Sequence, residues 1–200
     1  MNIIDNFDVV INYLNFQPGY FYPLEVVRRK KENSDRKHAK VLRKFRIEDK
    51  EEYYKLRDTI RDMCEFFKAR AYIRLNKREY KNIGLETLRW TAKYIADGDY
   101  RAVKNSFSKA VGNNHTEGYD RWIVDIDEKS KDVVNDVIKH IEHLQDHRDS
   151  DYSILGVVET PNGYHIITEP FDRRLFFNTY TDHDVKPDNP TILCSVSRKY

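Results

Sequence analysis

The sequence predicts an α+β protein in which a mixed sheet is flanked by helices and preceded by a more helical N-terminal region. Three observations support this fold class. Apolar residues recur at helical spacing in some stretches, they alternate with polar residues in others, and turn residues separate the two kinds of segment. The length of 200 residues suits one domain, and a hydrophobic fraction of 40% excludes a wholly disordered chain.

In the first half of the chain, the main signal is the helical spacing of apolar residues. It predicts helices over residues 49–67, about 82–96 and about 101–111. Gly98 and Gly112 are predicted to end the last two, because glycine readily adopts the left-handed conformation that stops a helix. Strands are predicted at 41–47 and 71–75. Pro18-Gly19 and Pro23 mark turns in the aromatic first 25 residues.

The second half predicts strands that alternate with helices. The predicted strands cover residues 121–127, 154–160, 164–169 and 191–197. One helix is predicted from a cap at Ser130 to about Leu144, and another over 172–180. The turn Pro161-Asn162-Gly163 predicts a tight hairpin, since Asn-Gly favours positive φ angles.

Positive charge is concentrated in residues 28–46. This basic block has ten basic side chains against two acidic ones, a local charge of +8 in a chain whose total charge is +2. A basic block on an otherwise acidic body is typical of a surface that binds a polyanion. A solvated loop without such a partner is the alternative. The basic residues are Arg28, Arg29, Lys30, Lys31, Arg36, Lys37, Lys40, Arg43, Lys44 and Arg46.

Several classes of protein are excluded or disfavoured. No apolar run approaches the roughly 18 residues that a membrane span needs, and the N-terminus has no secretory pattern. Cys64 and Cys194 allow at most one disulfide, so we expect a reduced, cytoplasmic protein. No glycine-rich phosphate loop of a nucleotide-binding type is present in the sequence.

The strongest candidate for chemistry is the run from Trp122 to Glu128. In a strand, alternate side chains share a face, so Asp125 and Asp127 project together, opposite to Val124 and Ile126. The two aspartate Cα atoms would lie about 6.8 Å apart, twice the rise per residue. Carboxylates at that separation can converge on one or two hard divalent cations, which also relieves their mutual repulsion. An acidic strand end in solvent is the alternative.

Two other segments contain side chains that suit phosphate. The hairpin turn places His165 at the start of a strand, beside exposed turn amides. A second group follows the strand at 71–75, where arginine can donate two hydrogen bonds to phosphate and lysine supplies a point charge. This group is Arg74, Asn76, Lys77 and Arg78. Each signal has an ordinary alternative, a hydrogen-bonded strand histidine and a basic strand end.

Together these segments resemble one family, the archaeo-eukaryotic primases of the primase-polymerase superfamily, and above all its small phage and plasmid members. The resemblance covers roughly residues 68–196. Arg121–Asp127 is similar to the family's metal-binding strand, Asn162–His165 to its histidine motif, and Ile73–Arg78 to the strand before the active site of viral members. It implies a single domain over 1–200, with a basic, helical region at 1–67 and an RRM-like catalytic core at 68–200.

The resemblance implies a metal-dependent nucleotidyltransferase that joins nucleotides on a nucleic-acid template. Asp125 and Asp127 would bind Mg²⁺ or Mn²⁺, and His165 would contact the phosphates of the incoming nucleotide. The family also uses a third acidic residue on a later strand. Asp188 is the first candidate for it, and Asp172 and Glu169 are others.

Further contacts and partners are implied in the same way. Residues near the nucleotide or template would be Arg74, Asn76, Lys77, Arg78 and Asn162. The basic block, beginning with Arg28, Arg29, Lys30 and Lys31, would hold the template backbone in a salt-sensitive way. The partners would be nucleoside triphosphates, a single-stranded DNA or RNA template, and a separate helicase or replication protein. For a phage-encoded member, the compartment would be the host cytoplasm.

Two other functions stay open. One is a nucleic-acid-binding module of the same fold that does not polymerise, because the third acidic residue is not assigned and no helicase or zinc-binding extension is present. The other is a metal-dependent nuclease that uses Asp125, Asp127 and Glu128.

Overall fold

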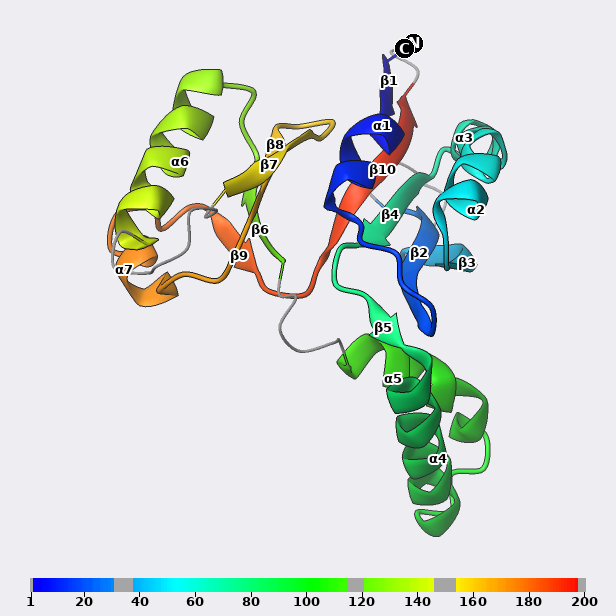
Figure 1. The fold of residues 1–200 in the computed structure, drawn as a ribbon. Helices are drawn as coiled ribbons and strands as arrows, with labels where there is room; N and C mark the ends of the chain where they lie inside the picture. The colour runs from blue at the N-terminus through cyan, green and yellow to red at the C-terminus, as the bar shows by residue number, and fades with distance from the viewer. Residues whose placement is uncertain (1, 31–37, 115–120, 146–153, 198–200) are drawn as a thin grey trace.

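The computed structural model describes residues 2–30, 38–114, 121–145 and 154–197. Two antiparallel sheets stand side by side in it (Figure 1). The first is six-stranded, with the order β1-β10-β4-β2-β3 and with β5 paired to β2. Its strands are β1 (Asn2–Asp5), β2 (Tyr20–Arg28), β3 (Lys40–Ile47), β4 (Arg70–Arg74), β5 (Arg78–Glu79) and β10 (Pro190–Ser197).

The second sheet is four-stranded and has the order β7-β8-β6-β9. Its strands are β6 (Trp122–Ile126), β7 (Ile154–Glu159), β8 (Tyr164–Thr168) and β9 (Asp184–Lys186). Along the chain, α6 (Lys131–Gln145) connects β6 to β7, and α7 (Arg173–Phe177) lies between β8 and β9. The described pairs in both sheets are antiparallel, so the predicted α+β class is confirmed, whereas the predicted mixed sheet is wrong.

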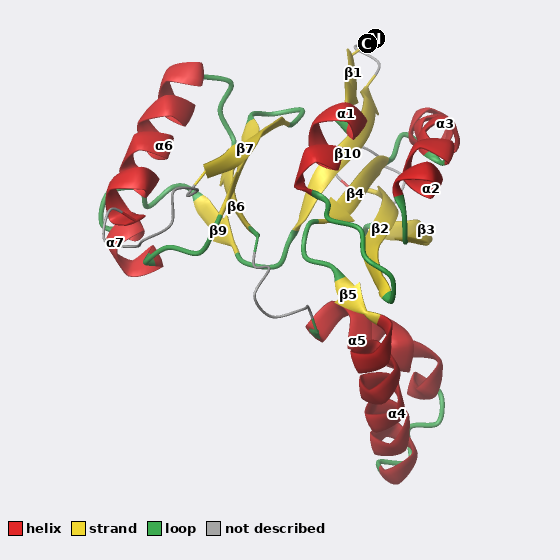
Figure 2. Ribbon diagram, viewed as in Figure 1, coloured by secondary structure: helices red, strands yellow, loops and turns green. Residues whose placement is uncertain are grey.

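The helices fall into three groups (Figure 2). One group packs with the first sheet: α1 (Phe7–Val10), the 3₁₀ turn η1 (Ile11–Tyr13), α2 (Lys50–Lys55) and α3 (Arg57–Phe67). In the second group, α6 and α7 cover the outer face of the second sheet. The third group projects from the body: α4 (Tyr80–Ala96), η3 (Ala102–Asn105) and α5 (Ser106–Asn113).

Strand β6 is buried on both faces, which explains why its sequence is so apolar. Val124 and Ile126 lie in the core beneath α6, as their alternation predicts. Ile123 faces the other way and belongs to the core of the first sheet, together with Val158 and Ile167. The second sheet is therefore sandwiched between its own helices and the first sheet, and polar residues on its inner face are held close to the first sheet.

The N-terminal region differs most from the prediction. Residues 1–67 contribute three strands to the first sheet as well as helices, and Pro23 lies inside β2, opposite Arg46 of β3. The helix predicted over 49–67 is two helices joined at Leu56. The first begins at Lys50 and is capped by Asp49, whose side chain accepts a hydrogen bond of 2.7 Å from the Glu52 amide.

The two predicted glycine stops have different outcomes. Gly98 has a φ of +73° just beyond α4, as predicted, because the chain turns there in the left-handed conformation. Gly112 lies inside α5, so the predicted stop there is wrong. Among the described helices, none is both long and apolar enough to cross a membrane.

Candidate functional site

A pocket of about 600 Å³ lies where the two sheets meet. It brings together five residues that the sequence analysis selects, namely Asp125, Asp127, Asn162, His165 and Arg29. The remaining lining residues are Arg70, Tyr72, Ile123, Thr160, Asp184, Lys186, Asn189, Pro190 and Ile192. Acidic side chains thus come from the second sheet, and arginines come from the first.

Asp125 lies at the centre of a row of polar side chains on the inner face of the second sheet. In the strand register it is opposite His165 of β8 on one side and Asp184 of β9 on the other. Opposite residues in antiparallel strands project on the same face, so this register gathers the three side chains. The aspartate strand and the histidine hairpin are therefore neighbours in space.

His165 is buried and has partners at both ring nitrogens. Its Nε2 lies 3.3 Å from Asp125 Oδ1, and its Nδ1 lies 2.9 Å from the Thr191 hydroxyl oxygen on β10. Because an ionised carboxylate only accepts, Nε2 carries the hydrogen that points to Asp125. The ring thereby links the second sheet to the first across the pocket.

The side chain of Asp125 is ionised, and each of its two carboxylate oxygens contacts a nitrogen of a neighbouring side chain. Lys186 Nζ lies 2.5 Å from Asp125 Oδ2, and His165 is at the other carboxylate oxygen. Burial by itself raises the pKa of Asp125, but the hydrogen bonds and charges of His165 and Lys186 outweigh it and hold this pKa well below its usual range. The ionised carboxylate of Asp125 is therefore stabilised by contacts that the folded protein provides.

Replacing Asp125 with asparagine is expected to lower the free energy of unfolding at pH 7 by about 1–3 kcal/mol, since charge-assisted contacts are lost. The folded pKa lies below the unfolded value of about 3.9. This contribution is therefore fully present above about pH 5 and is lost as the pH falls through the folded pKa. Urea unfolding of both proteins at pH 7 and pH 3 should show a smaller difference at pH 3. An equal difference at both pH values would contradict the assignment.

Gly163 fixes the hairpin against the end of β6. The Thr160 amide donates to the Gly163 carbonyl at 2.9 Å, and the Gly163 amide donates to the Thr160 hydroxyl at 3.0 Å. A Cβ on Gly163 would lie 1.9 Å from the Ile126 carbonyl oxygen and 2.6 Å from the Glu128 nitrogen. Gly163 is not among the described residues with positive φ, so the predicted reason for this glycine is wrong. Close backbone approach requires it instead.

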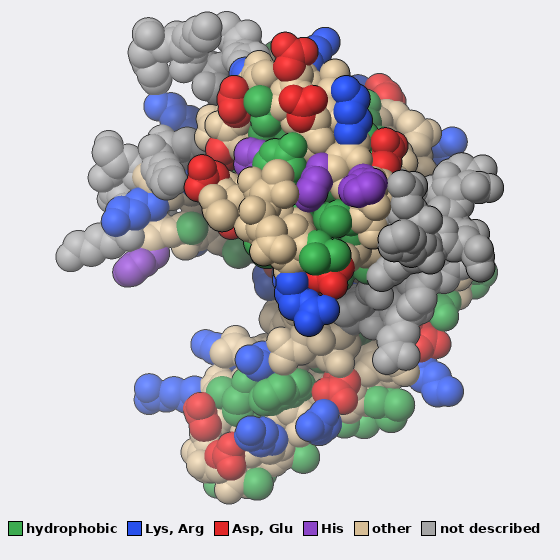
Figure 3. All heavy atoms as spheres, turned by 90° about the vertical axis from the view of Figure 1, so that its left-hand side faces the viewer, with side chains coloured by type: hydrophobic (Ala, Val, Ile, Leu, Met, Phe, Trp, Pro, Cys, Tyr) green, Lys and Arg blue, Asp and Glu red, His purple; other side chains and the backbone are tan. Residues whose placement is uncertain are grey.

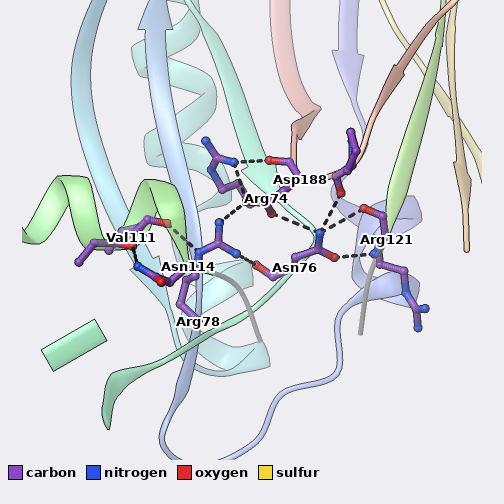
Figure 4. A network of polar contacts seen from close by, with 9 residues as sticks. Arg74, Asn76, Arg78, Val111, Asn114, Arg121 and Asp188 are labelled. Carbon is purple, nitrogen blue, oxygen red and sulfur yellow. Dashed lines mark hydrogen bonds and ion pairs between the residues drawn. The ribbon is translucent and has the colours of Figure 1, made fainter. Parts of the chain in front are cut away.

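The basic group at the end of β4 has a structural role that the sequence analysis did not foresee (Figure 4). Arg78 is fully buried and donates to Val111 O at 2.8 Å, Asn76 O at 2.7 Å and Asp188 Oδ2 at 2.7 Å. The Asn76 amide joins the same network, because it accepts from the Arg121 amide at 2.6 Å and donates to Asp188 Oδ1 at 3.2 Å.

This network ties α5, the end of β4 and the chain segments before β6 and β10 together. Arg74 also contacts the Asp188 carboxylate, at 3.3 Å. Lys77 is turned away from it, donates to Gln17 Oε1 at 2.7 Å and lies over the Tyr20 ring. None of Arg74, Asn76, Lys77 and Arg78 lines the pocket. A basic strand end has the same sequence pattern whether it meets solvent or an internal carboxylate, which is why the pattern was misinterpreted.

None of the predicted candidates for the third acidic residue lines the pocket. Asp188 is held by Arg78, Arg74 and Asn76. Asp172 caps α7 and pairs with Arg174 at 3.0 Å, and Glu169 lies 3.8 Å from Arg121 Nη1. Besides Asp125 and Asp127, the pocket is lined by a further acidic residue, Asp184, which lies opposite Asp125 in the strand register.

The basic block reaches the pocket only in part. Arg29 lines it, whereas Arg28 and Lys30 do not. Lys31 lies outside the described residues. Lys44 pairs with Glu25 at 3.0 Å on the neighbouring strands β2 and β3. Lys and Arg side chains also lie on both sides of the hollow between the body and the projection of α4 and α5 (Figure 3).

Four functional candidates escaped the sequence analysis: Arg70, Tyr72, Asp184 and Lys186. Asp184 and Lys186 belong to β9, a strand of three residues that is too short for its alternation around the buried Val185 to stand out. Arg70 and Tyr72 alternate with the buried Ala71 and Ile73 on β4, a pattern that was available in the sequence.

The pocket contains oxygen donors that suit a hard cation, although no three His, Cys, Asp or Glu side chains of the described ranges are gathered as a ready metal site. The Lys186 ammonium, close to both Asp125 and Asp184, shows that these carboxylates can hold positive charge. Comparisons of the chain with protein-family models, with curated proteins and with solved structures found no match.

Proposed function

We propose that the chain is a metal-dependent nucleotidyltransferase of the primase-polymerase type. The observation that carries this proposal is the pocket in which Asp125, Asp127 and His165 lie together, with arginines of the first sheet also in its lining. Acidic side chains suit a divalent cation, and basic ones suit the phosphates of a nucleotide or a nucleic-acid strand.

The second sheet supports the proposal at the level of topology. Its order of elements, β6-α6-β7-β8-α7-β9, and its strand order, β7-β8-β6-β9, agree with the split βαβ arrangement found in RRM-like sheets. In the proposed assignment, Asp125 and Asp127 belong to the central strand β6, and His165 belongs to its neighbour β8.

In this assignment, Asp125, Asp127 and Asp184 would hold Mg²⁺ or Mn²⁺. Asp184 replaces Asp188 as third candidate, because Asp188 neutralises the buried Arg78. A bound divalent cation lowers the pKa of an attacking hydroxyl and stabilises charge that develops on the phosphate. His165 would face the phosphates once Asp125 turned from it, since Nε2 now points to that carboxylate.

The first sheet offers the wall for a nucleic-acid strand. Arg70 and Tyr72 share one face of β4, and Arg29 follows the end of β2 beside them. Basic and aromatic side chains in one groove favour single-stranded nucleic acid, because the cations follow the backbone and a ring can stack on a base. This is sequence-neutral binding that salt should weaken.

Loss of one carboxylate is expected to reduce product formation by about 10²–10³-fold, the range seen when one group that stabilises developing charge is removed. The assay incubates the protein with single-stranded template, labelled nucleotides and Mn²⁺, and compares wild type with Asp127→Asn. Asp127 is exposed, so its replacement leaves the core intact. Asp182→Asn, at an exposed position outside the pocket, is the matched control.

The same assay tests the other functions. A shortened template with no new oligonucleotide would identify a nuclease and overturn the proposal. Binding of template without any chemistry would identify a nucleic-acid-binding module. The observation that favours this second candidate is that Lys186 and His165 already contact both carboxylate oxygens of Asp125, so that this carboxylate has partners without a metal ion.

A further inference from the structure

Lys186 occupies the position of a cation among the carboxylates of the pocket. Its Nζ lies 2.5 Å from Asp125 Oδ2 and 3.4 Å from Asp184 Oδ2. The other oxygen of Asp125, Oδ1, faces His165. Both oxygens of the central carboxylate are therefore in use, and a divalent cation that binds Asp125 must displace one of these partners.

Lys186 is the partner that can move more easily. Its side chain is 30% exposed and is attached to the pocket wall by its ammonium group, whereas the His165 ring is buried and also bonded to Thr191. A lysine is a point charge on a flexible four-carbon stem, so it can exchange one anionic partner for another by rotation of its own side chain.

The ion pair between Arg78 and Asp188 differs from the Lys186–Asp125 pair, because it is held rigidly in place. Arg78 is completely buried, and its guanidinium is fixed by three acceptors, among them Asp188. That pair has no room for exchange and does not line the pocket. The Lys186–Asp125 pair lines the pocket and has solvent access, as a displaceable contact requires.

We propose that Lys186 is a tethered competitor of the divalent cation at Asp125. The ammonium holds the carboxylates together in the metal-free protein and is displaced when the cation binds. The displaced lysine then pairs with the phosphates of a nucleotide in the same pocket, so that metal and nucleotide strengthen the binding of each other. This inference rests on the proposed function, because it takes Asp125 as a metal ligand.

The competition predicts that removal of the lysine charge strengthens metal binding. In a calorimetric titration with Mn²⁺ alone, Lys186→Gln is expected to bind Mn²⁺ about tenfold more tightly than wild type. Glutamine keeps a hydrogen-bond donor for Asp125, and Lys186→Met provides a second variant without one. Lys139→Met, which removes a lysine near Asp136 on α6, is the control and should leave the affinity unchanged.

The coupling predicts a second difference. A non-hydrolysable nucleoside triphosphate should increase the Mn²⁺ affinity of wild type by about tenfold and that of Lys186→Gln by much less. Because such coupling is reciprocal, Mn²⁺ should increase the affinity for the nucleotide by the same factor. Equal or weaker Mn²⁺ binding by both folded Lys186 variants would overturn the competition and leave the metal site standing. Absence of Mn²⁺ binding in wild type and variants alike would overturn the proposed metal site together with this inference.

Discussion

Replacing Arg78 with alanine is expected to destabilise the protein by about 3–5 kcal/mol, because it removes one partner of a buried ion pair. The guanidinium is fully buried and connects α5, Asn76 and Asp188. Its loss leaves the Val111 carbonyl without this donor and leaves a cavity beside Asp188. Urea unfolding monitored by circular dichroism measures the change, with Arg89→Ala as the control, since Arg89 is exposed and pairs with Glu86 one turn away on the surface of α4.

The stability of the Arg89→Ala control should stay within about 0.5 kcal/mol of wild type, because surface ion pairs usually contribute little to stability.

Asp188→Asn separates the structural role of this network from a role in metal binding. We expect it to lower the stability of the fold and to leave the Mn²⁺ affinity of the folded protein unchanged. If Asp188→Asn had normal stability but no longer bound Mn²⁺, Asp188 would again be the candidate for the third metal ligand.

Replacing Gly163 with alanine is expected to destabilise the protein by several kcal/mol, beyond the roughly 1–3 kcal/mol of ordinary overpacking. The new Cβ would collide with backbone atoms of Ile126 and Glu128, which cannot rotate away as a side chain can. Relief requires the hairpin to move from β6, which would also separate His165 from Asp125. Thermal and urea unfolding measure the stability, and the NMR signals of the His165 ring report the displacement.

Gly84→Ala is the matched control for the glycine prediction. Gly84 lies inside α4 with open space around its Cα, so alanine should stabilise the protein by about 0.5–1 kcal/mol through helix propensity. Equal stability of the two alanine variants would contradict the close approach of the hairpin to β6.

The parts that were predictable from sequence are those where one periodicity extends over enough residues. Five alternating residues around Val124 identified β6 and the face that Asp125 occupies. The three residues of β9 are too few to show such a pattern, so neither Asp184 nor Lys186 was predicted as a site residue.

Residues whose role depends on distant partners were not predictable in this way. Arg78 and Asp188 are separated by 110 positions, and only the fold shows that they neutralise each other. Pro23 was predicted to mark a turn, yet it lies inside β2, opposite Arg46 of β3. The break at Leu56 leaves the helical spacing of the surrounding residues intact, so one helix was predicted where two exist.

The position of β10 has a consequence for how the chain acquires its structure during synthesis. This strand is inserted between β1 and β4, so β1 acquires its neighbour in the sheet only when residues 190–197 have left the ribosome. Until then, the earlier strands have an unpaired edge, which is a hazard for aggregation. Such a long delay between the first and the last member of one sheet predicts slow folding that is completed after translation of β10 and benefits from chaperones.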